Sequence, residues 1–446
     1  MDTIETKIVK RIDENRDAII AFARDIYTHA ELGFKEFRTA GKFADALKAL
    51  RLPAIETGLA LTGVKGYLKP KGEGVNIALI GELDALRIPS HTYANPETQA
   101  AHCCGHHAQL AGVLGAAYAL SDTEVAPALG GNVTFFAVPA EEYGEIAFKN
   151  QLKEEGKIRY GGGKCELIRT GAFDDITLSI AHHLNNEGPA TGSGSSNGFV
   201  SKVIRILGRA AHAAGAPHRG VNALNAAALG HTALQYQRET FKDEDHVRVH
   251  PIITKGGDLV NVIPDEVILE ALVRAKTIEA IKDADRKTDR AYKAGACALG
   301  AGYEIETMPG YLPQLPAQAH PALIEAIKDV FPGKEPKIRG EDHHGAGSTD
   351  VGDVQHIQPV LTFSTGGSKG AYHSPAFEII DEEEAYISTA KIFALGAYKL
   401  LKNNAEAAKE AAANYKPKFT KDTYVRFMES LIRKEQKGVT EDEPLE

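Results

Sequence analysis

A short segment of this chain, residues 101–109, concentrates side chains that can bind a metal ion. It reads Ala-His-Cys-Cys-Gly-His-His-Ala-Gln, so three histidines and two cysteines fall within six positions, in a chain with only four cysteines. Thiolates and imidazoles are common zinc ligands, and they bind at about 2.0–2.3 Å. Cys104 and His106 are two positions apart, so in a loop both can face one point. The segment therefore predicts part of a metal site that opens a helix.

Further donors follow three other predicted strands. An apolar strand over 132–138 runs into Glu141 and Glu142, and the strand over 176–181 runs into His182-His183. His373 comes shortly after a strand over 360–363. Strand ends in α/β proteins gather at one crevice, where chemistry is placed. The residues alone leave open whether His182 or His183 is the donor.

The adjacent carboxylates Glu141 and Glu142 have a chemical use at such a site. One can bind a metal while its neighbour accepts a proton from water whose pKa the metal lowers towards about 7. A solvated acidic turn is the alternative for this glutamate pair, but the position after a buried-type strand argues against it.

A hydrolase with a thiol nucleophile, in which Cys103 or Cys104 attacks with a nearby histidine, is an alternative to the metal enzyme. It would survive metal removal.

Composition narrows the class of protein. With 446 residues, two domains are expected. The net charge of -9 and the absence of a long basic run argue against nucleic acid as a partner. No apolar run of about 18 residues predicts a membrane span, and the charged N-terminus does not resemble a signal peptide. A cytoplasmic location is therefore expected, where a Cys/His cluster indicates metal binding or catalysis rather than disulfides.

The expected elements divide the chain into an α/β domain with an insertion. Residues 1–194 form its first part, beginning with one long amphipathic helix over 3–30. The polar stretch Tyr143–Lys164 is long for a connection, so we expect a functional loop or lid. Residues 195–309 show a β-α-β-β-α-β order, which is typical of a ferredoxin-like domain. Residues 310–446 return to the first domain and end in a charged, helix-prone tail.

Together these motifs resemble the metal-dependent amidohydrolases that include aminoacylases, auxin-conjugate hydrolases and carboxypeptidase relatives. Residues 81–86 and 347–354 are most similar to the aminobenzoyl-glutamate hydrolase branch. The resemblance implies a zinc-peptidase-like α/β catalytic domain with an inserted ferredoxin-like α+β lid, through which the chain forms a homodimer or a higher homo-oligomer. It also implies one or two divalent transition metal ions as cofactors, manganese or zinc foremost.

The resemblance also implies a role for each site residue. The metal ligands are Cys104, His106, Glu142, His183 and His373. Glu141 is the general base, and His212 reaches across the dimer to polarise the scissile carbonyl. Asn261 of the lid matches a substrate-side position. His107 stands where the family usually has Asp or Asn, so we expect it to bind substrate.

The expected activity is hydrolysis of a C–N bond in a small molecule, foremost amide cleavage of an N-acyl or aminobenzoyl amino acid. His107 and the insertion beside the metal indicate a specialised substrate, for example a small aromatic compound. An aminohydrolase that releases ammonia from an aromatic amine is the alternative among enzymes. A metal-binding scaffold without catalysis is the alternative outside them.

Overall fold

The computed structural model describes residues 1–72 and 74–440, which form two compact units. Unit 1 comprises Met1–Ser195, Leu315–His344 and Asp353–Lys421. Unit 2 comprises Ser196–Gln314, Gly345–Gly352 and the described chain from Asp422 onward. All of 310–446 was predicted to belong to the catalytic domain, whereas 310–314, 345–352 and the described chain from 422 onward belong to unit 2.

Unit 1 is built on an eight-stranded mixed sheet with the order β1-β2-β6-β3-β7-β16-β8-β14 among the described residues. Its central strands are β6 (Asn132–Val138), β3 (Asn76–Glu82), β7 (Leu178–Leu184) and β16 (Val360–Thr365), each parallel to its neighbour. The flanking strands are β1 (Ala54–Leu59), β2 (Gly63–Tyr67), β8 (Ala190–Thr191) and β14 (Lys337–Ile338). Every residue of β3 is buried, as expected for a strand covered on both faces. The carboxyl ends of the four central strands therefore share one edge.

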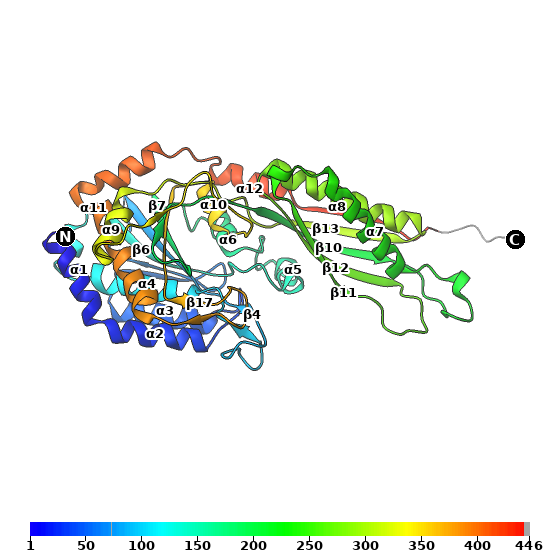
Figure 1. Ribbon diagram of the computed structural model, residues 1–446, viewed down its shortest axis with the longest axis horizontal. Helices are drawn as coiled ribbons and strands as arrows, with labels where there is room; N and C mark the ends of the chain where they lie inside the picture. The colour runs from blue at the N-terminus through cyan, green and yellow to red at the C-terminus, as the bar shows by residue number, and fades with distance from the viewer. Residues whose placement is uncertain (73, 441–446) are drawn as a thin grey trace. The chain divides into compact units, whose positions relative to one another are not determined.

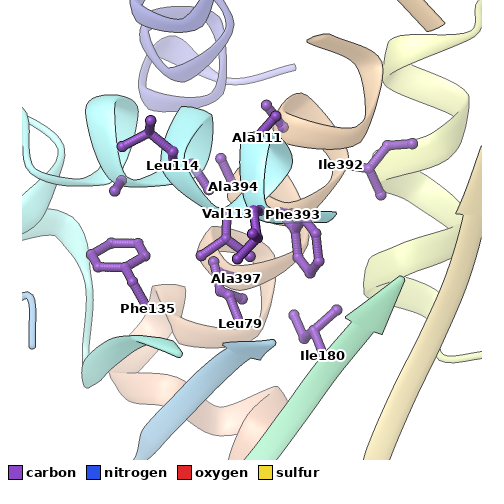
Figure 2. Packing of buried hydrophobic residues seen from close by; sticks show 14 of the residues in the cluster. Leu79, Ala111, Val113, Leu114, Phe135, Ile180, Ile392, Phe393, Ala394 and Ala397 are labelled. Atoms are coloured by element: carbon purple, nitrogen blue, oxygen red, sulfur yellow. The ribbon is translucent and has the colours of Figure 1, made fainter. Parts of the chain in front are cut away.

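The core of unit 1 lies where α4 (His106–Leu120) and α11 (Thr389–Asn414) cover this sheet (Figures 1 and 2). Figure 2 shows Phe393 of α11 and Val113 of α4 above Leu79 of β3. Nearly every residue of α4 is buried. A helix that is apolar all round is a buried helix, so the residues after the metal-binding segment fix its place against the sheet.

The remaining elements of unit 1 are mostly short. The helices are α1 (Thr3–Glu14), α2 (Arg16–Thr28), α3 (Phe37–Ala49), α5 (Ile146–Glu154), α6 (Gly163–Arg169), α9 (Pro321–Val330) and α10 (Val351–Gln355), with a π-helical turn over Glu383–Ser388 before α11. Small strand pairs are β4 (Leu86–Arg87) with β5 (Ala100–Ala101) and β17 (Ser368–Lys369) with β18 (Glu378–Ile379). No helix in the described chain has the length and apolar character needed to cross a bilayer.

The predicted single helix over 3–30 is wrong, because Asn15 divides it into α1 and α2. Asn15 leaves the helical conformation, with φ -103° and ψ 11°, and its backbone N–H closes the last turn of α1. Apolar periodicity continues across the break, so periodicity alone did not reveal it.

A buried ion pair attaches α1 to α11, and we expect it to give unit 1 an acid-sensitive contact. Lys399 Nζ lies 2.8 Å from Glu5 Oε1. Burial would raise the pKa of Glu5, but Lys399 and the backbone of Asp2 outweigh burial and lower it to about 2, from an ordinary value of 4.5. The ionised carboxylate therefore stabilises the fold above about pH 4.5, and this contribution is lost as the pH falls towards 2.

Replacing Lys399 by methionine should lower the Tm at pH 7 by on the order of 5 °C, because the buried Glu5 keeps only Lys402, at 3.2 Å, and Asp329 loses its contact with Lys399. The fall in Tm between pH 4.5 and 2 should become shallower than in the unchanged chain. Thermal unfolding followed by circular dichroism measures both. Lys10→Met, in an exposed pair with Glu14, is the control and should change neither.

Unit 2 has the predicted β-α-β-β-α-β order and gains a strand that was not predicted. Its sheet has the order β11-β12-β10-β13-β19, with α7 (Ala223–Tyr236) and α8 (Ile278–Ala298) along one face (Figure 1). The strands are β10 (Gly198–Leu207), β11 (Arg248–Lys255), β12 (Glu266–Ala275), β13 (Gly302–Pro309) and β19 (Arg433–Lys437), and α12 (Lys421–Ser430) precedes β19. The inserted domain is confirmed.

The prediction of a helical tail is wrong for its last part. β19 pairs antiparallel with β13, and Arg433 donates hydrogen bonds to Asp285 and Asp289 of α8 at 2.7 and 3.0 Å. The strand reads Arg-Lys-Glu-Gln-Lys, without the apolar alternation that identifies a strand in sequence. Charged residues are common on edge strands, so the tertiary contact overrides the local pattern.

Candidate metal centre

Four of the predicted ligands converge at the carboxyl edge of the unit 1 sheet. Cys104 Sγ lies 3.3 Å from His183 Nε2 and 3.4 Å from His373 Nε2. His373 Nε2 is in turn 3.1 Å from Glu142 Oε1. Gly105, with φ +90°, turns the chain between Cys104 and the start of α4, and a Cβ there would lie 3.0 Å from Leu184. A glycine is needed at this bend.

His106, the fifth predicted ligand, is oriented by the chain around it. Its Nδ1 lies 2.8 Å from the carbonyl oxygen and 3.3 Å from Oδ1 of Asp84. Its Nε2 is left to face Glu82 Oε2 at 3.1 Å and Glu141 Oε2 at 3.9 Å. Burial would lower the pKa of His106, but Glu82 and the other nearby groups outweigh burial and raise it. An imidazole whose Nδ1 is held by a carboxylate, here Asp84, and whose Nε2 faces further carboxylates is typical of a metal ligand.

The chemistry of these donors fits a divalent metal ion. Three overlapping groups have ligand atoms within 4.8 Å of one another: Cys104, His106 and His183; Cys104, Glu142 and His373; Glu82, His106 and Glu141. Among the described residues, His106 Nε2 and Glu142 Oε1 are buried and make no hydrogen bond of good geometry, although they lie 3.1 Å from Glu82 Oε2 and His373 Nε2, respectively. Ligands at about 2.1 Å from one metal ion are about 3.0–3.4 Å apart. Buried ligand atoms at this spacing that lack a good hydrogen bond are expected where their lone pairs face a shared metal ion.

The structure distinguishes the two candidate histidines of β7. His183 contacts Cys104, and its Nδ1 lies 2.7 Å from the carbonyl oxygen of Leu184, which leaves Nε2 facing the donor cluster. His182 points to the opposite face of the strand, where its Nε2 lies 2.8 Å from Thr365 Oγ1 and its ring packs on Phe363. Successive side chains of a strand alternate between faces, so only one of the pair can reach the centre.

His107 lies on the core side of α4. It has no exposed surface, and its Nε2 lies 3.2 Å from the hydroxyl of Tyr386. Its ring centre is 4.5 Å from that of Tyr27, and burial lowers its pKa. Contact with substrate therefore stays a prediction for His107, one that its burial does not support. Among its neighbours, His102 and Cys103 are also buried.

Two carboxylates of this centre were not predicted as site residues. Glu82 is the last residue of β3 and Asp84 follows it, and they are 4 % and 0 % exposed. Glu82 accepts hydrogen bonds from Lys164 at 2.6 Å and Gln109 at 2.8 Å. Burial would raise the pKa of Glu82, but Lys164 and His106 outweigh it and lower the pKa to about 2. The position of both carboxylates at a strand end, like that of Glu141, was the signal that could have identified them.

The turn that presents the glutamate pair is strained and held by buried acids. Ala140, directly before Glu141, adopts φ +49°, which side chains disfavour. Its N–H donates to Glu36 Oε1 at 2.8 Å, and the N–H of Glu142 donates to Asp84 Oδ2 at 2.8 Å. Burial and the charge of Asp84 raise the pKa of Glu36 to about 7.

The family match identifies the class of protein. Residues 78–397 match the model of peptidase family M20/M25/M40, which is more than half of the chain. The chain belongs to this family. It is therefore a metal-dependent hydrolase of amide or peptide-like bonds. The resemblance inferred from the sequence motifs is confirmed, and so is the fold class.

Curated relatives of this M20 protein differ in substrate. The Xaa-Arg dipeptidase of Mus musculus is 26 % identical over 373 residues, covering 80 % of this chain and 79 % of the relative. The N-acetyl-L-cysteine deacetylase of Bacillus subtilis (strain 168) is 26 % identical over 406 residues, covering 87 % and 89 %. One of the chains of the p-aminobenzoyl-glutamate hydrolase of Escherichia coli (strain K12) is 29 % identical over 324 residues, covering 69 % and 60 %.

Solved structures support the same fold. A dinuclear metal-binding M20 peptidase of Bacillus subtilis has a TM-score of 0.61 at 22 % identity, covering 87 % of this chain and 99 % of that one. The aminobenzoyl-glutamate utilization protein of Klebsiella pneumoniae has a TM-score of 0.64 at 19 % identity, covering 88 % and 98 %. At these identities the likeness concerns the fold.

Unit 2 of this M20 protein places His212 beside Asn261. Residues 212 and 262 form an isolated β-bridge, and the N–H of Ala213 donates to the carbonyl oxygen of Asn261 at 3.0 Å. His212 Nδ1 accepts hydrogen bonds from the N–H groups of Ala214 and Gly215 at 3.2 and 3.0 Å. Asn261 and His212 are both exposed. A neutral imidazole whose Nδ1 accepts must carry its proton on Nε2, so the other ring nitrogen of His212 is a donor.

Metal removal separates the M20 mechanism from a thiol enzyme. Burial, and next the charge of Glu142, raise the pKa of Cys104, which is opposite to what activates a thiol nucleophile. Dialysis against a chelator should therefore abolish hydrolysis, and adding manganese or zinc should restore it. Alkylation of the metal-loaded protein, followed by mass spectrometry, should leave Cys104 unmodified. Full activity after chelation would contradict the metal-dependent account.

Proposed function

We propose that this M20 protein hydrolyses the amide bond of an N-acyl or aminobenzoyl amino acid, with Glu141 as general base. The observation that carries the proposal is the convergence of Cys104, Glu142 and His373 beside a second, adjacent carboxylate. Cys104, His106, Glu142, His183 and His373 would hold one or two divalent ions, with manganese and zinc as the first candidates. When bound, the metal acidifies water and polarises the substrate carbonyl.

The position of Glu141 suits proton transfer. Its side chain is mostly buried, and its Oε2 lies 3.9 Å from the ligand nitrogen of His106. It thus adjoins the ligands, although it belongs to neither of the two groups that contain Cys104. Glu141 would take a proton from the attacking water and deliver it to the amide nitrogen as the C–N bond breaks.

His212 would stabilise the charge that develops on the carbonyl oxygen. The donor on its Nε2 is fixed by the two backbone N–H groups that occupy Nδ1. A preoriented donor is worth most where negative charge develops. We place this histidine in the site of a partner protomer, with Asn261 on the substrate side of the same segment.

An exposed apolar surface on unit 2 supports a homodimer. β11 is an edge strand of the sheet, and Ile252 and Ile253 on it are 52 % and 53 % exposed. Leu259 and Val260, close to Asn261 in the chain, are 64 % and 103 % exposed. Unprotected edge strands with apolar side chains invite pairing with another chain. Dimerisation through this surface would allow His212 of one protomer to approach the site of its partner.

A substrate panel with product analysis tests the proposed function. The panel comprises acetyl-amino acids, aminobenzoyl-glutamate, dipeptides and aromatic amines. We expect a free amino acid to appear in equal amount to the acid released. Tyr372, whose ring centre lies 5.4 Å from that of His183, would favour aromatic acyl groups. Ammonia without a released amino acid would reject amide cleavage in favour of an aminohydrolase.

A further inference from the structure

The insertion over residues 143–164 is packed against the turn that carries the glutamate pair. Leu152 and Ile158 form a buried cluster with Phe34 and Ala140. At the other end, the N–H of Gly163 donates to the carbonyl oxygen of Ala140 at 3.1 Å. A Cβ on Gly163 would come within 1.7 Å of the carbonyl oxygen of Pro139, so only glycine allows this approach. The insertion is therefore a folded part of unit 1.

Near one end of the insertion, Lys149 reaches the backbone of the glutamate pair. It lies on α5 and is only 2 % exposed, and its Nζ donates to the carbonyl oxygen of Glu142 at 2.8 Å. The ammonium also lies over the rings of Tyr143 and Phe34, at 4.6 and 5.6 Å from their centres. Ring faces attract a cation, so these contacts hold Lys149 in place.

The other end of the insertion delivers Lys164 to the carboxylate of Glu82. Lys164 has no exposed surface, and its Nζ lies 2.6 Å from Glu82 Oε1. The second oxygen of Glu82 faces His106 Nε2 at 3.1 Å. Lys164, together with Gln109, therefore fixes the carboxylate that adjoins a predicted metal ligand.

The carboxylates gathered at the centre require a nearby positive charge. Glu82, Asp84 and Glu141 are nearly fully buried within one small region, and Glu142 adjoins them. Like charges this close repel, and buried charges are costly unless they are paired. Lys164 offsets part of that repulsion at Glu82, and Lys149 binds the backbone of Glu142, and neither ammonium group occupies a ligand position. Groups that form hydrogen bonds with metal ligands commonly determine how tightly the metal binds.

We propose that the insertion is a brace for the metal centre, in which Lys149 fixes the backbone of Glu142 and Lys164 fixes the carboxylate of Glu82. Both lysines are positioning residues. The proposal rests on the proposed function, because it presupposes that the centre binds a metal. The insertion thus has a supporting role, whereas its polar sequence predicted a functional loop or lid.

Metal affinity of the full chain tests the brace without a substrate. The metal-free protein is titrated with manganese and separately with zinc, by isothermal titration calorimetry. Lys149→Met and Lys164→Met should each weaken binding about 10- to 100-fold. The conservative variants Lys149→Arg and Lys164→Arg should recover part of the affinity, and they serve as the test if a methionine variant does not fold.

Lys65→Met is the matched control for burial of a lysine. Lys65 is 1 % exposed and its Nζ contacts the carbonyl oxygen of Ala172 and Asp175 Oδ1, away from the ligand set. It should lower the Tm of the metal-free protein as the other variants do, yet leave metal affinity unchanged. If the unchanged chain binds metal and both methionine variants bind it equally well, the brace is wrong. If the unchanged chain binds neither metal, the proposed function fails with it.

Discussion

Replacing Glu141 by glutamine should lower kcat by about 10²- to 10⁴-fold while the protein keeps its metal. The amide has nearly the same shape as the carboxylate but cannot accept the proton of the attacking water, and general-base catalysis contributes a factor of this size. The five proposed ligands are unchanged, so metal content should stay at the level of the unchanged chain. Steady-state kinetics combined with elemental analysis of the same sample measures both.

Glu155→Gln is the control for the loss of one carboxylate. Glu155 lies in the insertion that follows Glu141, and it is exposed and paired with Lys157. Its replacement should leave kcat and metal content unchanged. Glu141→Gln protein that retains its metal and more than a tenth of its activity would show that another group takes the proton. Loss of metal in that variant would instead make Glu141 a ligand.

Removing the thiolate ligand should have the second large effect, this time on binding. Cys104→Ala deletes the atom that lies 3.3 and 3.4 Å from the two histidine nitrogens. If a four-ligand site contributes about 10–16 kcal/mol, each ligand accounts for roughly 2.5–4 kcal/mol, or about two to three orders of magnitude in affinity. Activity at limiting metal should fall in parallel and recover partly at high metal concentration.

Cys103→Ala is the matched control, since Cys103 is the adjacent cysteine and its side chain belongs to the apolar core. It should retain both metal affinity and activity. Activity that disappears in Cys103→Ala and persists in Cys104→Ala would assign the chemistry to the Cys103 thiol and overturn the ligand set proposed above.

Most of the fold was predictable from the sequence because its signals were local. The apolar runs of β3, β6 and β7 could be recognised in the chain, as could the donors at the ends of β6 and β7, and parallel strands bring such ends together. The division of the first helix at Asn15 and the strand β19 were missed. Each depends on a tertiary contact or a local backbone angle that apolar periodicity does not encode.

Part of the donor set could be predicted from the sequence, but the groups that support the donors could not. Strand alternation explains why His183 and not His182 faces the centre, but the phase of that alternation became visible only in the structure. Lys149 and Lys164 belong to the polar stretch for which a functional loop or lid was predicted. Their burial follows from the packing of Leu152 and Ile158, which links the insertion to Ala140. Such long-range contacts are not visible in residue spacing.

The most direct test of the metal centre is an anomalous-difference map from crystals of the protein grown with manganese or zinc. The account predicts one or two peaks at about 2.0–2.3 Å from donor atoms of Cys104, His106, Glu142, His183 and His373. Glu141 should lie beside the peaks without being the nearest ligand. A fully occupied peak elsewhere, or ordered donors with no peak at saturating metal, would contradict it.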